Sequence, residues 1–203
     1  MNGYFGVVKI IGVVGGIGSG KTSVTDYLGS RYGACIVDAD VVARDLVMPG
    51  SLTLDALVDA FGNAILTPEG HYDRAFVAQV VFESTPALRR LNAITHAAIG
   101  VEIIRQLQSA TSELVAVALP LFRVEHRHLF GLQRVWSVLS SPEVAVGRLV
   151  DYRGFDPHDA QARIRSQRDP KIVASECDEV IANDGSLEDL YRNVDGLMST
   201  LRV

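Results

Sequence analysis

The sequence predicts an α/β fold in which five parallel strands form one sheet. Two observations carry this prediction: apolar runs alternate with helical stretches, and the first run leads straight into a glycine-rich loop. A parallel pair of strands needs a crossover connection, usually a helix, so this alternation is typical of a doubly wound core. The five predicted strands cover residues 9–14, 34–37, 113–119, 134–139 and 179–182.

The glycine-rich loop begins where the first predicted strand ends. Residues 15–22, GGIGSGKT, have the spacing of a phosphate-binding loop, and a helix over residues 23–32 is predicted to follow. Glycines let several backbone N–H groups converge on phosphate oxygens, and the helix N-terminus adds positive charge. The alternative is a glycine-rich turn without a ligand, but the complete pattern between a strand and a helix favours a bound nucleoside triphosphate.

The loop pattern also assigns roles to individual residues. Lys21 is predicted to reach the β- and γ-phosphates, and the Thr22 hydroxyl is predicted to bind a Mg²⁺ ion carried by the nucleotide. The predicted nucleotide-binding residues of the loop are Gly16, Ile17, Gly18, Ser19, Gly20, Lys21, Thr22 and Ser23.

Composition limits the class of protein. The 203 residues suffice for one domain with a sizeable core, and 48% hydrophobic with 21% charged residues is typical of a soluble globular chain. No apolar run approaches the roughly 20 residues of a membrane span. The N-terminus has no basic region before its apolar stretch, which argues against a secretory signal and predicts a cytoplasmic protein. Cys35 and Cys177 are expected to be free thiols, and a net charge of −5 argues against general nucleic-acid binding.

A long helical segment separates the second and third predicted strands. Its amphipathic runs cover residues 52–61, 73–82 and 87–107, which is more than one crossover helix requires. Ligands of open α/β sheets bind at the carboxyl edge of the strands. We therefore expect a helical insert, about residues 63–109, that lies over this edge and binds the acceptor.

A second helical segment, about residues 145–175, is predicted to form a lid. Two helices, 142–151 and 156–167, are joined by a turn that contains Gly154 and Pro157. The core then comprises about residues 1–62, 110–144 and 176–203.

The lid segment concentrates positive charge in an acidic protein. Guanidinium groups stabilise the charge that develops on a transferring phosphoryl group without exchanging protons, and Arg148 and Arg153 are the favoured candidates. The alternative, which applies most to Arg163, Arg165 and Arg168, is a solvated helix face.

Two acids follow the second predicted strand. In kinases of small hydroxyl compounds, a carboxylate orients the acceptor hydroxyl and takes its proton, and Asp40 is our candidate for this base. The alternative is that Asp38 or Asp40 caps a helix beginning at Val41. Arg44 lies four residues after Asp40, so it either holds an anionic group of the acceptor or forms an ion pair with Asp40. His96 lies in a helical run, where a histidine is usually a packed or surface residue.

Several motifs in a fixed order resemble the dephospho-CoA kinase family over nearly the whole chain. They are GGIGSGKT, VDADVVARDLVMPG, LNAITH, ALPLF, VGRL and VIANDG. The first suits many P-loop kinases, but its combination with DAD-x-x-AR and PG is much more specific. The resemblance implies a P-loop kinase core with a five-stranded parallel sheet, a helical acceptor-binding insert and a helical lid. It also implies transfer of the ATP γ-phosphate to the ribose 3′-hydroxyl of dephospho-CoA.

The resemblance implies roles for residues beyond the loop. It matches Asp40 to the catalytic base, Arg44 to an arginine of the acceptor site, and His96 to the histidine of a Leu-His-Pro motif. Arg148 matches the first lid arginine, and Asn183 would lie near the adenine of ATP. The predicted catalytic set is Lys21, Asp40 and Arg148, and the predicted substrate-binding set is Asp38, Asp40, Arg44 and His96.

Two motifs depart from the family pattern, and two other functions are alternatives. The Leu-His-Pro motif reads Thr95-His96-Ala97, and the acid Glu125 is displaced by one residue. The nearest alternative function is another small-molecule or nucleoside monophosphate kinase. A GTPase-type switch is disfavoured because no guanine-reading Asn-Lys-x-Asp motif occurs. The expected partners are therefore ATP and dephospho-CoA, with the chain a monomer or a small homo-oligomer.

Overall fold

A computed structural model describes residues 8–201 of the chain. The first residues of the N-terminus, which we predicted to carry no secretory signal, lie outside this range. The chain divides into two compact units, one made of the residues up to Asp38 and from Ala110 onward, the other of Ala39–Ser109. No helix among the described residues is long and apolar enough to cross a membrane.

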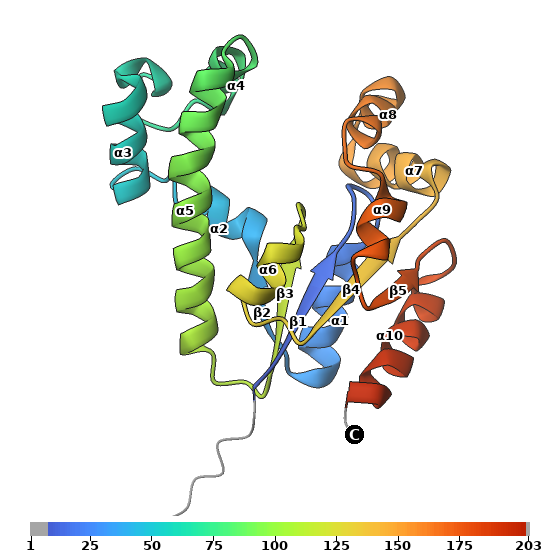
Figure 1. Ribbon diagram of the computed structural model, residues 1–203. Coiled ribbons are helices and arrows are strands. Elements are labelled where there is room, and N and C mark those ends of the chain that lie inside the picture. The colour runs from blue at the N-terminus through green and yellow to red at the C-terminus, as the bar shows by residue number, and fades with distance from the viewer. Residues whose placement is uncertain (1–7, 202–203) are drawn as a thin grey trace, which may run out of the picture. The chain divides into compact units, whose positions relative to one another are not determined.

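The first unit contains the predicted five-stranded parallel sheet, in the order β2-β3-β1-β4-β5 (Figure 1). Its strands are β1 (Lys9–Val14), β2 (Cys35–Asp38), β3 (Leu114–Leu119), β4 (Arg134–Leu139) and β5 (Glu179–Ala182). In register, Val14 pairs with Leu119 and Ser137, and Asp38 pairs with Ala118. The carboxyl ends of β1, β2, β3 and β4 therefore meet at one edge of the sheet, where the glycine-rich loop begins.

Six helices accompany the sheet in the described part of the first unit. They are α1 (Lys21–Tyr32), α6 (Val124–Leu129), α7 (Pro142–Arg153), α8 (Pro157–Arg165), α9 (Pro170–Ser175) and α10 (Leu187–Leu201). The predicted pair of lid helices is present as α7 and α8. Sequence reasoning missed α6, α9 and α10. In α10 the signal was present, because Leu190, Val194 and Met198 repeat every four residues and form its buried face.

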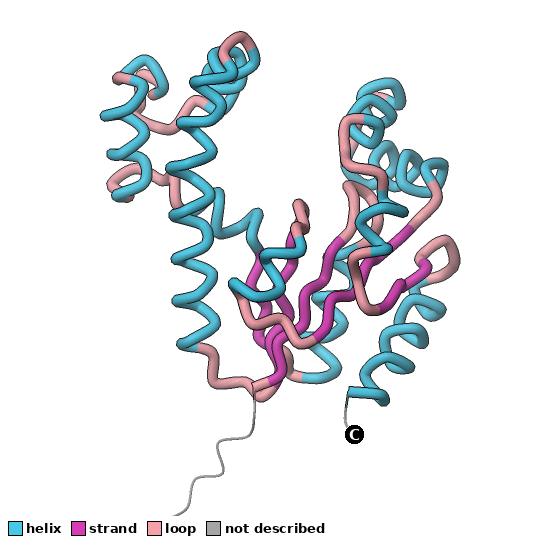
Figure 2. Tube along the Cα trace, in the orientation of Figure 1, coloured by secondary structure: helices cyan, strands magenta, loops and turns pink. Residues whose placement is uncertain are grey.

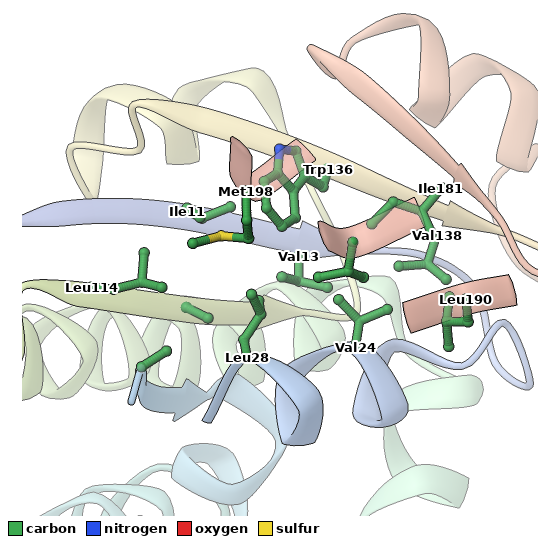
Figure 3. Close-up of a cluster of buried hydrophobic side chains, with 13 residues drawn as sticks. Ile11, Val13, Val24, Leu28, Leu114, Trp136, Val138, Ile181, Leu190 and Met198 are labelled. Carbon is green, nitrogen blue, oxygen red and sulfur yellow. The ribbon is translucent and has the colours of Figure 1, made fainter. Parts of the chain in front are cut away.

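The core of the first unit lies between the sheet and two helices. Val24 and Leu28 of α1 and Leu190 and Met198 of α10 pack with Trp136 and other side chains of the strands (Figure 3). Val24 and Leu28 lie four residues apart, so they form one apolar face of α1, and this face packs against the sheet. The loop therefore joins a buried strand to a helix whose inner face is packed into the core.

The second unit consists of helices and the loops that join them, all within the described residues (Figure 2). They are α2 (Ala39–Asp45), α3 (Leu52–Phe61), the short 3₁₀ helix η1 (Asn63–Ile65), α4 (Arg74–Phe82) and α5 (Thr85–Ser109). Ser51 and Asp73 cap α3 and α4 by accepting from Leu54 N and Phe76 N. Val47, Leu57, Ile65 and Val77 form a small core of their own.

Both cysteines are free thiols, as predicted, and Cys177 has a marked preference for its neutral form. Burial raises the pKa of the Cys177 thiol from 9.0 to about 11, against a smaller opposing effect of Arg127. Its Sγ donates to the Val173 carbonyl at 3.1 Å.

We expect Cys177 to react with iodoacetamide at pH 8 about a hundredfold more slowly in the folded protein than in denaturant. The reason is that a pKa higher by about two units leaves about a hundredth of the thiolate. Mass spectrometry of the peptide that contains Cys177 measures both rates. Equal rates in the two states would contradict the raised pKa.

Candidate functional site

The glycine-rich loop joins β1 to α1, as its pattern requires. The helix begins at Lys21, two residues earlier than the predicted Ser23, so Lys21 and Thr22 belong to its first turn. Gly18 and Gly20 have φ angles of 76° and 96°, which residues with a side chain rarely adopt. The first intrahelical bond runs from Val24 N to Gly20 O at 3.2 Å, so the N–H groups before it point out of the helix end. Such an array of donors binds anionic oxygens.

The lysine of the pattern lies against the loop itself. Lys21 Nζ donates to the carbonyl oxygens of Gly15 and Gly16, at 2.7 Å and 3.2 Å. The ammonium group is therefore held beside the loop backbone. The side chain of Thr22 is exposed at the start of α1.

Asn183 and Arg148 meet the loop from two other elements. Asn183 follows β5 and is only 4% exposed; its Nδ2 donates to the Ser19 carbonyl at 2.7 Å. Its Oδ1 accepts from Arg148 Nη2 at 3.2 Å. A Cβ atom at position 20 would lie 2.1 Å from Asn183 Nδ2, so this contact requires the glycine. The structure thus brings Lys21, Arg148 and Asn183 together at the loop.

One end of the Arg148 guanidinium has no partner. Its Nη1 is buried and makes no hydrogen bond within the described part of the chain. It lies 3.8 Å from the point where a Cβ of Gly20 would stand. A buried cationic donor without an acceptor is costly unless it serves a bound group, and here it lies beside a loop built for anions.

Residues of the lid helices also contact the loop, and sequence reasoning missed them. A Cβ at Gly18 would lie 2.8 Å from the Ala145 carbonyl of α7, so α7 packs directly on the loop. Ile17 N donates to Gln167 Oε1 at 2.8 Å, from the segment between α8 and α9. No sequence signal marked Gln167, because a polar residue after a helix is common and its partner lies 150 positions away.

The predicted acceptor residues lie on the second unit, except for Asp38, which ends β2. Asp40 is exposed in the first turn of α2, and Arg44 is exposed in its last turn. The alternative that Asp40 caps a helix beginning at Val41 is wrong, because α2 begins at Ala39 and Asp40 lies inside it. His96 is exposed on α5. The three side chains of the second unit are thus accessible rather than buried in its core.

The donor set for Mg²⁺ is sparse. No group of three or more His, Cys, Asp or Glu side chains within residues 8–201 is arranged to hold a metal ion. Mg²⁺ in kinases binds through one or two protein oxygens together with substrate phosphates and water. A single hydroxyl at the head of α1, that of Thr22, fits this mode of binding.

Comparison with known proteins identifies the family. The model of one protein family, described as dephospho-CoA kinase, matches residues 9–189. The chain belongs to the dephospho-CoA kinase family. A dephospho-CoA kinase of Corynebacterium jeikeium is 38% identical over 194 residues, which cover 94% of this chain and 98% of the relative. One of Corynebacterium glutamicum is 41% identical over 198 residues, covering 94% and 96%.

A solved structure agrees with the assignment of the fold. The crystal structure of TT1252 from Thermus thermophilus has a TM-score of 0.78 and 26% identity, covering 95% of this chain and 97% of that one. The chain therefore has the P-loop kinase fold that its motifs predicted. The run Thr95-His96-Ala97 lies inside α5, which extends from Thr85 to Ser109 without a break.

Proposed function

We propose that this chain catalyses the reaction for which its family is named, the ATP-dependent phosphorylation of dephospho-CoA. The γ-phosphate of ATP passes to the ribose 3′-hydroxyl, and the products are coenzyme A and ADP, the last step of coenzyme A synthesis. The observation that carries this proposal is the family match over residues 9–189, which spans both compact units. The loop supplies the donor side of the reaction independently of that match.

On the donor side, the loop N–H groups and Lys21 bind the ATP phosphates, and Thr22 binds the Mg²⁺ that ATP carries. Mg²⁺ neutralises charge on the β- and γ-phosphate oxygens. Arg148 stabilises the transferring phosphoryl group, and its buried Nη1, which has no acceptor within the described residues, supports this role. Asn183 supports the loop and Arg148 through its two hydrogen bonds, which adds to its proposed place near the adenine.

On the acceptor side, Asp40 accepts the proton of the 3′-hydroxyl as the hydroxyl attacks. Asp38 and His96 contribute to the acceptor site, and Arg44 binds an anionic group of the substrate. The exposure of Asp40, Arg44 and His96 supports these roles, since a side chain that binds a diffusible substrate must be reachable.

Two free cysteines without a disulfide suit a reducing compartment, and the cytoplasm is the proposed location. Both substrates are small molecules, so the reaction requires neither a nucleic acid nor a membrane partner.

A coupled assay of ADP release with a panel of acceptors tests the proposal. We expect turnover with dephospho-CoA far above the ATPase background, and no comparable turnover with nucleoside monophosphates or shikimate. Removal of Mg²⁺ with a chelator is expected to abolish turnover, because the phosphate charges then lack their counter-ion. Turnover with another acceptor and none with dephospho-CoA would show that the chain had diverged from the activity of its family.

A further inference from the structure

The lid contacts the phosphate loop through one side-chain amide, that of Gln167. Its Oε1 accepts from Ile17 N at 2.8 Å, across 150 positions of sequence. Both residues belong to the first compact unit. This is a direct hydrogen bond between the loop and the segment that joins α8 to α9.

The segment that carries Gln167 is fixed on both sides of it. Gln167 N donates to the Ile164 carbonyl at 3.2 Å, which ties it to the end of α8. Arg168 forms a two-point ion pair with Glu176, with Nη1 donating to Oε2 at 2.8 Å. Asp169 caps α9 by accepting from Lys171 N at 2.8 Å. The neighbours of Gln167 therefore bind within the lid, while its own side chain extends to the loop.

The identity of residue 16 supports the importance of this contact. Gly16 is not among the loop glycines with positive φ, so its backbone conformation does not require glycine. A Cβ at position 16 would lie 2.8 Å from Gln167 Oε1 and would meet no other group of the described residues closer than 4.0 Å. A side chain at position 16 would therefore have to displace the end of the Gln167 side chain.

We propose that Gln167 is a positioning residue, which fastens the lid to the phosphate loop through the Ile17 amide and so holds the lid arginine at the transferring phosphate. The bond adds to the direct packing of α7 on the loop, where the Ala145 carbonyl lies against Gly18. Arg148 lies one turn beyond Ala145 on the same helix. The lid thus contacts the loop at two points, at Gly18 through α7 and at Ile17 through Gln167.

The substitution Gln167→Ala is expected to lower kcat for dephospho-CoA about fivefold to tenfold, with the KM for ATP changed less than about twofold. The reason is that loss of the anchor misplaces the lid in the transition state, whereas the loop and Lys21 still bind the nucleotide. Gln161→Ala, at an exposed glutamine of α8, is the matched control and should retain wild-type kinetics. A lower KM for ATP at unchanged kcat would overturn the proposal, since Gln167 would then compete with the phosphates for Ile17.

The substitution Gly16→Ala allows the contact to be tested from the loop side. Its Cβ would displace Gln167 Oε1, so alone it should lower kcat by about the same factor as Gln167→Ala. In the Gln167→Ala background the clash is absent, so Gly16→Ala should lower kcat by a smaller factor there than it does alone, whatever its separate effect on the KM for ATP. Independent, multiplicative losses would show that the two positions act separately.

The kinetic part of this inference rests on the proposed function, so hydrogen exchange at Ile17 provides a readout that does not. Gln167→Ala should speed exchange of the Ile17 amide in the protein without substrates, and Gln167→Glu, which keeps an acceptor oxygen, should retain protection. Fast exchange in the Glu variant, or unchanged exchange in the Ala variant, would overturn the positioning role whichever acceptor the enzyme uses. Inactivity of the wild-type protein on dephospho-CoA, with the exchange pattern intact, would instead reject the proposed function.

Discussion

The substitution Asp40→Asn is expected to lower kcat for dephospho-CoA by about a hundredfold to ten-thousandfold, the usual range for removal of a general base. The amide has almost the shape of the carboxylate but accepts no proton. The affinity for ATP should stay within about twofold, because the interaction is made mainly in the transition state of acceptor attack. Steady-state kinetics with each substrate varied in turn, together with binding of a fluorescent ATP analogue, measure the two effects separately.

The helix that carries Asp40 offers a matched control. Asp45 is an exposed aspartate at the last residue of α2, and Asp45→Asn should leave kcat unchanged. Asp38→Asn separates the two acids of the motif, since only one of them can be the base. An unchanged kcat in Asp40→Asn with a large loss in Asp38→Asn would transfer the role to Asp38.

The sheet and the phosphate loop were predictable from sequence because their signals are local. The central strands β1, β3 and β4 are buried along most of their length on both faces, so each appears as a short continuous apolar run, and the loop has its full eight-residue pattern. The predicted strands agree with the observed ones to within one residue at each end. The order of the strands was not predicted, because register and neighbours depend on contacts between distant parts of the chain.

The starts of helices were predicted less accurately than the strands, and the short helices were not predicted. The loop pattern led us to start α1 at Ser23, whereas the helix begins at Lys21 directly after the left-handed Gly20. The Asp40 cap was wrong for a similar reason, because α2 begins immediately at the end of β2. With six residues each, α6 and α9 are too short for helical periodicity to be recognised.

In the candidate site, the residues of the loop were predictable, but the hydrogen bonds that other elements make to the loop were not. Asn183 was predicted near ATP, yet its side chain joins Ser19 to Arg148, a contact that only the fold creates. Gln167 gave no signal at all, since its partner is a backbone N–H far away in sequence. Side chains that act by holding other groups lack a characteristic spacing, and this limits what sequence reasoning finds.

The substitution Arg148→Ala is expected to lower kcat by about three orders of magnitude or more, since an arginine that clamps a transferring phosphoryl group contributes about a thousandfold to a hundred-thousandfold. The loss should be smaller with Arg148→Lys, which keeps the charge but not the planar fork that reaches Asn183 and the phosphate together. Arg165→Ala, at an exposed arginine at the end of α8, is the control and should have wild-type kcat.

The effect of Arg148→Ala on stability separates a catalytic arginine from a structural one. The substitution removes the hydrogen bond to Asn183 Oδ1, whereas the buried Nη1 has no hydrogen-bond partner to lose within the described residues. Asn183 keeps its bond to Ser19 while its buried Oδ1 loses the arginine, so the free energy of unfolding should fall by about 1 to 3 kcal/mol. Chemical denaturation of the wild-type protein and of Arg148→Ala measures this change. A large loss of kcat beside so small a loss of stability is the signature of a group that acts on the phosphate. A fall in stability with kcat unchanged would assign Arg148 to the support of the loop alone.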